Sequence, residues 1–245
     1  MSFNMLAQCL ARSSQFPYVA MNQLKRQNRW PKVWAEIERY GADLICLQEC
    51  DLFPKILANL MHKEGFKYRG VYKEKTGGSP HGLGIIYNAL VFELVKTESC
   101  EFGEELNNGV ALFCLLRHRA PAAPYGAPGV NASSSAAAAG GGAGGEASGK
   151  YGNPKPSPNP SVGGAGEDGV GVGSDGWGHA VCIVNTHLYW HPEGDSIRLA
   201  QASATMMAVQ AFLREECGDS YEQMPLILAG DLNTQPGTGV YKARH

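Results

Sequence analysis

The sequence lacks several features that would assign it to a common class. It has no apolar run of the about eighteen residues that a membrane span requires, and its opening segment lacks the basic stretch of a secretion signal. CxxC pairs and the Cys and His spacings of zinc sites are also missing. We therefore expect an intracellular protein, cytoplasmic or nuclear, with no membrane partner; targeting to an organelle stays open.

Motifs for covalent catalysis and for nucleotide binding are missing as well. The chain has no GxSxG, so a serine nucleophile on a strand-to-helix turn is not indicated. It has no GxxxxGK[ST], and no GxGxxG follows a predicted strand. Charge of one sign is scarce, since the net charge of −2 gives no overall attraction to nucleic acid. An RNA substrate would therefore need a local basic patch or a bound cation.

One tract of low complexity stands out. Residues 120–176 are dominated by Gly, Ala, Ser and Pro, a composition that cannot bury enough apolar surface to offset the entropy of ordering. We expect a disordered insertion within a single domain that spans residues 1–245. Because the tract joins a strand ending near Leu116 to one beginning near Ala180, we interpret it as an expanded hairpin loop.

Short apolar runs bounded by polar residues predict at least six strands. Those rich in branched residues are expected to be buried central strands, apolar on both faces. These runs are Leu44–Leu47, Val181–Val184 and Leu226–Ala229, with similar runs at residues 84–87 and 110–116 and a shorter strand at residues 3–6. Cys46, Cys114 and Cys182 lie within such runs, so we expect buried free thiols and a reducing compartment.

Apolar residues at helical spacing predict helices near residues 30–40, 54–64 and 196–216. Pro31 suits the first turn of the first helix, and Gly41 ends it. The inner face of the third helix is expected to carry apolar residues, namely Ile197, Ala200, Met207, Ala211 and Phe212. Since strands and helices alternate irregularly, the sequence predicts a layered α/β architecture.

Polar residues follow the buried strands directly. Glu49 comes after Leu47, His187 after Val184, and Asp231 and Asn233 after Ala229, while Asn4 lies in the first short strand. Strand ends of α/β sheets are close in space, so we expect these side chains to converge. Any one of them alone could be a cap or a turn former. As a set, hard carboxylate oxygens favour Mg²⁺, with Mn²⁺ as an alternative, over zinc.

The same residues suit the hydrolysis of a phosphodiester, which needs a cation, a positioned water and donors to the non-bridging oxygens. We expect Glu49 to hold the metal and Asp231 to orient or deprotonate the water. Donors to the phosphate would be Asn4, His187 and Asn233.

Four motifs in this order resemble the endonuclease/exonuclease/phosphatase superfamily. They are Asn4 within Phe3–Ala7, Leu47-Gln48-Glu49, Asn185-Thr186-His187-Leu188 and Gly230-Asp231-Leu232-Asn233. The segment from Asn185 to Glu193, followed by Ile197–Gln201, resembles the deadenylase branch of the Ccr4 and nocturnin proteins. Asn4–Leu10, Phe16–Tyr18 and Pro80–Leu83 are most similar to fungal Ngl-type RNA exonucleases.

The resemblance implies a four-layer α/β sandwich of two facing mixed sheets flanked by helices, and Mg²⁺-dependent 3′-to-5′ hydrolysis of single-stranded RNA from its 3′ end. It further implies that Glu49 and Asn4 contact the metal, with His187 at the metal or the scissile phosphate. Asp231 and Asn233 would position the attacking water. Pro192, with Trp190, would pack against a substrate base, because an unpaired base can lie on a rigid apolar surface.

Two departures from the family pattern affect these expectations. Ccr4 and nocturnin proteins commonly carry Asp-Gly where this chain has His81-Gly82, so base preference near that loop is expected to differ. The family closes with strands bearing an Asp and then Ser-Asp-His, whereas this chain stops at His245, twelve residues after Asn233. We therefore expect a sandwich that is incomplete at its C-terminus, in which case the chain as given could be inactive.

Alternatives stay open at two levels. His81 either lines the cleft or is an ordinary loop residue, and Arg198 either reaches a phosphate or is solvated or salt-bridged. For the whole domain, the alternatives to an RNA 3′-exonuclease are a phosphatase acting on a small phosphorylated metabolite and a non-catalytic RNA- or partner-binding remnant.

Overall fold

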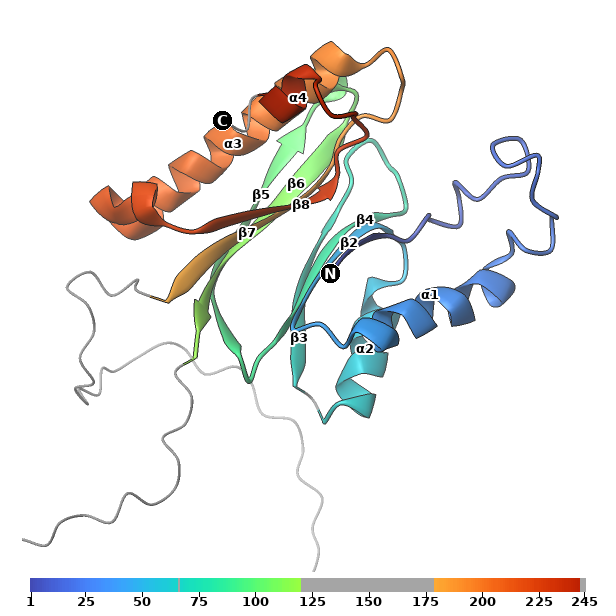
Figure 1. Ribbon diagram of the computed structural model, residues 1–245, viewed down its shortest axis with the longest axis horizontal. Helices are drawn as coiled ribbons and strands as arrows, with labels where there is room; N and C mark the ends of the chain where they lie inside the picture. The colour runs from blue at the N-terminus through green and yellow to red at the C-terminus, as the bar shows by residue number, and fades with distance from the viewer. Residues whose placement is uncertain (66, 120–178, 243–245) are drawn as a thin grey trace, which may run out of the picture. The chain divides into compact units, whose positions relative to one another are not determined.

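The computed structural model describes residues 1–65, 67–119 and 179–242 (Figure 1). The predicted insertion at residues 120–176 lies outside this range. Within it, eight strands form two four-stranded sheets. The first sheet has the order β1 (Ser2–Asn4), β2 (Leu44–Cys50), β4 (Gly82–Asn88) and β3 (Tyr68–Glu74). The second has the order β5 (Phe92–Phe102), β6 (Gly109–His118), β7 (Ala180–His187) and β8 (Leu226–Asp231).

Both sheets are mixed, because β1 pairs in parallel with β2 and β7 in parallel with β8, while the other pairs are antiparallel. Helices α1 (Arg26–Tyr40) and α2 (Phe53–Lys63) pack on the first sheet, and α3 (Asp195–Cys217) packs on the second (Figure 1). Short helices occur at Glu104–Leu106, Gly218–Gln223 and, as α4, Gly239–Lys242. The four-layer α/β sandwich is thus confirmed. No described helix is long and apolar enough to cross a membrane.

Burial on two sides explains why the central strands are apolar throughout. In β2, Ile45 and Leu47 face α1 and α2, whereas Cys46 faces the other sheet. In β6, Phe113 and Leu115 face α3, and the alternating residues Leu112, Cys114 and Leu116 meet the first sheet. A strand covered on both faces loses the polar alternation of a half-exposed one, so the runs of branched residues predicted these strands correctly.

A strand was predicted correctly at Leu226–Ala229, but the prediction that it is buried was wrong. The strand exists as β8, but it forms the edge of its sheet. Its side chains are exposed or half-buried, with Leu226 at 37% and Ile227 at 48% exposure. Its apolar composition is that of a strand with neighbours on both sides, and in the described part of the chain only β7 pairs with it. Cavities of about 350 and 360 Å³ flank it.

Two helices differ from their predictions. Helix α1 begins at Arg26, so Pro31 lies inside the helix rather than in its first turn, and Tyr40 is exposed. The stop at Gly41 is confirmed, since this residue adopts the left-handed conformation that glycine favours. In α3, the predicted inner face was wrong in part: Phe212 is buried, but Met207 is 71% exposed. Polar side chains fill the first half of the buried face, namely Arg198, Gln201 and Thr205.

Strands β3 and β5 escaped prediction because both lie at sheet edges. Their burial alternates or is partial along most of their length, and charged residues occupy the exposed positions. Charged side chains are common on edge strands because they discourage pairing with other chains. Composition alone therefore gives little signal there.

Candidate active site

Glu49 is presented by an irregularity in β2. The pairing of β2 with β4 shifts register between Leu47 and Cys50, and Glu49 adopts a φ of 50°. A non-glycine residue in this conformation is strained, and such strain persists where surrounding contacts fix it. Here the contacts are hydrogen bonds to the Glu49 carboxylate, whose Oε2 accepts from the Ala7 backbone N–H at 3.0 Å. The irregularity thus directs a buried carboxylate to the end of the strand.

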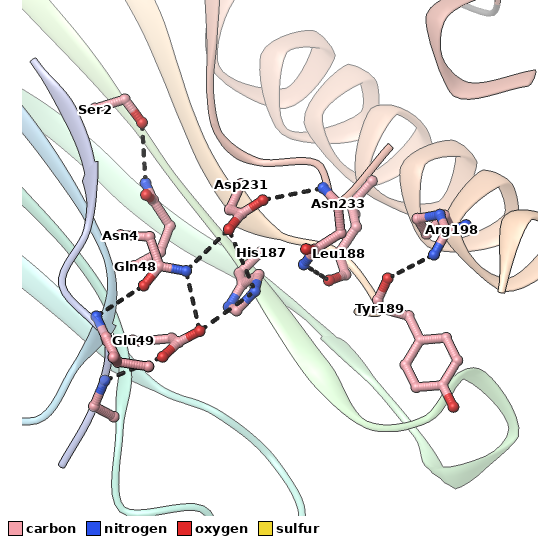
Figure 2. Close-up of polar contacts among 12 residues, drawn as sticks. Ser2, Asn4, Gln48, Glu49, His187, Leu188, Tyr189, Arg198, Asp231 and Asn233 are labelled. Atoms are coloured by element: carbon pink, nitrogen blue, oxygen red, sulfur yellow. Dashed lines mark hydrogen bonds and ion pairs between the residues drawn. The ribbon is translucent and has the colours of Figure 1, made fainter. Parts of the chain in front are cut away.

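One amide group connects the two candidate carboxylates (Figure 2). The Asn4 Nδ2 donates to Glu49 Oε1 at 3.0 Å and to Asp231 Oδ2 at 2.9 Å. Asn4 and Glu49 come from the first sheet and Asp231 from the end of β8 in the second. The convergence predicted from the strand ends is therefore present in the structure. Asn4 Oδ1 accepts from the Leu6 N–H, so in this arrangement the Asn4 amide bonds to both carboxylates, and its contact with a metal stays a prediction.

His187 lies at the end of β7 beside both carboxylates. Its Nε2 is 3.8 Å from Glu49 Oε1 and 3.9 Å from Asp231 Oδ2. Burial lowers the pKa of His187 below its ordinary value, and this outweighs the two carboxylates, which act in the opposite direction. The imidazole is therefore neutral near pH 7 and can donate one N–H to a ligand.

A turn after β8 fixes Asp231. The Asn233 backbone N–H donates to Asp231 Oδ1 at 3.1 Å, and Asn233 adopts a φ of 48°, which Asn tolerates better than most residues. The Asn233 side chain donates to the Leu188 carbonyl at 2.9 Å, and the Leu188 N–H donates to the Asp231 carbonyl. The predicted water-positioning pair therefore lies together, held against the segment that follows His187 (Figure 2).

A small cavity beside Glu49 and His187 is lined by two further polar residues. Its lining includes Glu49, His187, His81 and Lys75. His81 is 4% exposed, which agrees with the interpretation that it lines the cleft. Lys75 was not singled out from the sequence, because one lysine at the end of an edge strand carries no signal. Burial lowers the pKa of Lys75, and Glu49 opposes that shift.

The loop that carries Lys75 is tied to the second sheet. Thr76 Oγ1 donates to the carbonyl of Phe102 or Gly109 and accepts from the Gly109 N–H at 2.7 Å. Lys75 N–H donates to the His81 carbonyl at 3.0 Å. The Lys75 side chain is therefore carried by a segment that is hydrogen-bonded to both sheets.

The remaining predicted residues lie in the segment after β7. Trp190 is 64% exposed and Pro192 is exposed, so both are available to a ligand. Arg198 is 3% exposed, and its guanidinium bonds to three backbone carbonyls and to Asp195. This geometry favours the salt-bridged alternative for Arg198 over a phosphate contact. Cys50, the thiol nearest in sequence to Glu49, has a pKa raised to about 12 by burial, so it is no nucleophile.

The donor set suits a hydrated divalent cation better than a closed metal cage. Among the described residues, no group of three or more His, Cys, Asp or Glu side chains is arranged to hold a metal ion. Two carboxylates nevertheless meet here, and the donors that contact them are neutral: the Asn4 amide and the N–H groups of Ala7 and Asn233. Mg²⁺ commonly binds through one or two carboxylates and keeps several waters. Glu49 and Asp231 fit that mode of binding.

The fold and the site together define a class of α/β sandwich in which two facing sheets bring carboxylates, amides and a histidine to one end. Residues 1–244 match the Endonuclease/Exonuclease/phosphatase family, and the chain belongs to this family. It is 29% identical to 2′,5′-phosphodiesterase 12 of Rattus norvegicus, over 98% of this chain and 34% of that protein. It is also 29% identical to carbon catabolite repressor protein 4 homolog 4 of Arabidopsis thaliana, over 98% of this chain and 54% of that protein.

Solved structures show the same fold. The crystal structure of ANGEL2, a 2′,3′-cyclic phosphatase, matches with a TM-score of 0.65 and 21% identity, over 98% of this chain and 55% of the other. The human nocturnin catalytic domain matches with a TM-score of 0.61 and 20% identity, over 98% of this chain and 65% of the other. The resemblance to the Ccr4/nocturnin branch is thus confirmed, while the likeness to Ngl-type enzymes stays a prediction. The chain spans about a third of the length of its 2′,5′-phosphodiesterase relatives.

Proposed function

We propose that this domain hydrolyses phosphodiester bonds at the 3′ end of single-stranded RNA, with Mg²⁺ or Mn²⁺ bound beside Glu49 and Asp231. The observation that carries the proposal is the shared donor: one Asn4 nitrogen holds carboxylates from two different sheets. Two carboxylates this close repel each other, and a divalent cation offsets that repulsion. The names of the relatives, a phosphodiesterase among them, support the same reaction type.

Each residue has a role that its position supports. Glu49 would hold the cation from a fixed backbone position, while Asp231, which is more exposed, would orient the attacking water and accept its proton. A bound divalent cation supplies positive charge to the phosphate and makes a water easier to deprotonate. The neutral His187 donates its N–H to a non-bridging oxygen. Asn233 keeps Asp231 oriented through its backbone N–H.

A second candidate concerns the bond that is cut. One relative is named a 2′,5′-phosphodiesterase and one structural neighbour a 2′,3′-cyclic phosphatase. Both names describe phosphate esters that involve the 2′ oxygen of RNA. The candidate site accepts such substrates in principle, since the same metal and water serve different leaving groups. Cleavage of a 3′,5′ linkage is therefore to be compared with these two reactions in one assay.

The test compares four substrates in Mg²⁺ and in EDTA: an RNA with a 3′-OH, a 2′,5′-linked oligoadenylate, an RNA ending in a 2′,3′-cyclic phosphate, and inositol phosphates. We expect stepwise shortening of the first RNA that EDTA abolishes. Asp231→Asn should lower the rate by about 10²- to 10⁴-fold, whereas Asp219→Asn, at an exposed position after α3, should not. Intact RNA with hydrolysed inositol phosphates would support a phosphatase instead. Binding of RNA without cleavage of any substrate would support the non-catalytic alternative.

A further inference from the structure

The first half of α3 buries polar side chains where a helix on a sheet normally buries apolar ones. Arg198 is 3% exposed and Gln201 is 1% exposed. Burying a guanidinium or an amide costs free energy unless hydrogen bonds replace the lost water. The two Nη groups of Arg198 and the side-chain oxygen of Gln201 form such hydrogen bonds with the segment from Leu188 to Asp195, which connects β7 to α3. The hydrogen bonds to this segment therefore explain why the buried face of α3 is polar in its first half.

Backbone groups of this segment converge on the two side chains. The guanidinium of Arg198 donates to the carbonyls of Tyr189, at 3.1 Å, His191, and Pro192, at 3.0 Å. The Arg198 Nη2 that donates to Pro192 also donates to the Asp195 carboxylate. Gln201 accepts from the Tyr189 N–H at 2.8 Å and donates to the Leu106 carbonyl at 2.7 Å. One planar cation and one amide thus hold the backbone of the segment at several points.

The segment so fixed carries three aromatic side chains, Tyr189, Trp190 and His191, and Figure 2 shows Tyr189 beside Leu188. The Tyr189 ring stacks on His191 at a centroid distance of 6.2 Å, and Trp190 lies 5.5 Å from His191. At Gly194 a Cβ would lie 2.4 Å from the Tyr189 ring, so the segment also closes tightly on itself. Its first residue, Leu188, bonds to Asp231 and Asn233. The aromatic segment is therefore tied through its backbone to the turn that holds Asp231.

We propose that Arg198 is a positioning residue for substrate binding. It acts through the backbone of Tyr189–Pro192 and fixes Trp190 and Pro192 at the distance from Asp231 at which they contact a base whose phosphate lies at the carboxylates. The proposal rests on the proposed function for the identity of the ligand. Lysine carries the same charge but cannot form the planar fork that three carbonyls and one carboxylate share. Arg198→Lys is therefore the informative substitution. It keeps the positive charge and leaves no large cavity in place of the side chain.

The test is a double-mutant cycle on the full chain, with Arg198→Lys, Trp190→Ala and both together. Binding of a 5′-labelled single-stranded oligoadenylate with a non-hydrolysable linkage at its 3′ end is measured by fluorescence anisotropy in Mg²⁺, so that no cleavage intervenes. Each single variant should weaken binding about tenfold, the lower range of one base–aromatic stack. The double variant should bind no more weakly than either single one, because Arg198 acts through the loop. Arg214→Lys, on the same helix and exposed, is the matched control and should bind like the wild type.

A second readout needs neither RNA nor activity. In protein labelled with 5-fluorotryptophan, the Trp190 resonance, assigned by its absence in Trp190→Phe, should be sharp in the wild type and broadened or doubled in Arg198→Lys. Failure of the proposed function appears as intact RNA in Mg²⁺, whatever the state of Trp190. The positioning role is overturned if Arg198→Lys leaves both the RNA affinity and the Trp190 resonance unchanged, or if the losses of the two single variants add in the double variant.

Discussion

Gln48 and Asn185 bond to each other between the two sheets, at 2.8 Å from Gln48 Nε2 to Asn185 Oδ1, and both side chains are buried. Asn185 also donates to the carbonyls of Leu47 and Gly84 in the first sheet. Gln48 precedes Glu49, and Asn185 lies two residues before His187. This polar link lies next to the apolar core between the sheets and fixes the two sheets where the candidate site begins.

Asn185→Ala should lower the free energy of unfolding by roughly 2 kcal/mol or more, because it leaves buried groups without a partner. Urea unfolding followed by circular dichroism measures the change. Asn28→Ala is the control, since Asn28 bonds to Asn22 at an exposed position, and it should change stability by less than about 0.5 kcal/mol. Equal effects of the two substitutions would contradict the structural role assigned to Asn185.

The stability of the domain should depend on pH through His81. Burial lowers the pKa of His81 below its ordinary value of 6.5, and Lys75 and His187 lower it further, while Glu49 and Asp51 act in the opposite direction. The unfolded chain therefore binds a proton at a higher pH than the folded protein does. The contribution of His81 is fully present above about pH 6.5 and is lost as the pH falls through the lowered pKa.

The measurement is the unfolding free energy between pH 7.5 and pH 5.5. His81→Gln should make the decrease with falling pH smaller, without abolishing it, because the pKa of His187 is lowered as well. His62→Gln, at an exposed position on α2, should leave the decrease as in the wild type. If His81→Gln and the wild type lost stability in parallel, the buried neutral state of His81 would be contradicted.

Among the described residues β8 is an edge strand, and this edge should promote self-association. An edge strand that is apolar along most of its length is a template for pairing with another chain; in β8 the one charged residue is Asp231 at its end, and Ile227 is 48% exposed. Ile227→Lys should increase the monomer fraction in size-exclusion chromatography with light scattering. Met207→Lys, at a position 71% exposed on α3, introduces the same charge elsewhere and should have little effect. If both lysine substitutions raised the monomer fraction equally, a general effect of charge would be indicated instead.

Much of the fold could be predicted from the sequence because central strands carry a strong signal. The apolar runs at β2, β4, β6 and β7 are buried on two sides, which gives them a composition that few other elements have. Edge strands gave no such signal, and β8 gave a misleading one. Its sequence indicates neighbours on both sides, whereas the described residues supply one. Burial depends on partners that a local pattern does not contain.

The site residues that could be predicted from the sequence are those that lie at the ends of strands. Glu49, His187 and Asp231 are strand-end residues, and they lie together as expected. Lys75 was missed because its place in the cavity depends on a loop held by the other sheet. The burial of Arg198 could not be predicted from the sequence either. Buried cations are rare, and the partners of this one include backbone carbonyls, which a sequence pattern does not show.

We expect one divalent cation to bind at Glu49, with Asp231 beside it. Binding of Mn²⁺, measured by electron paramagnetic resonance of the free ion during titration, tests it directly. We predict one site in the wild type, which is lost or weakened at least about tenfold in both Glu49→Gln and Asp231→Asn and is retained in Asp219→Asn. Unchanged Mn²⁺ binding in Glu49→Gln and Asp231→Asn, or no binding by the wild type, would contradict the claim.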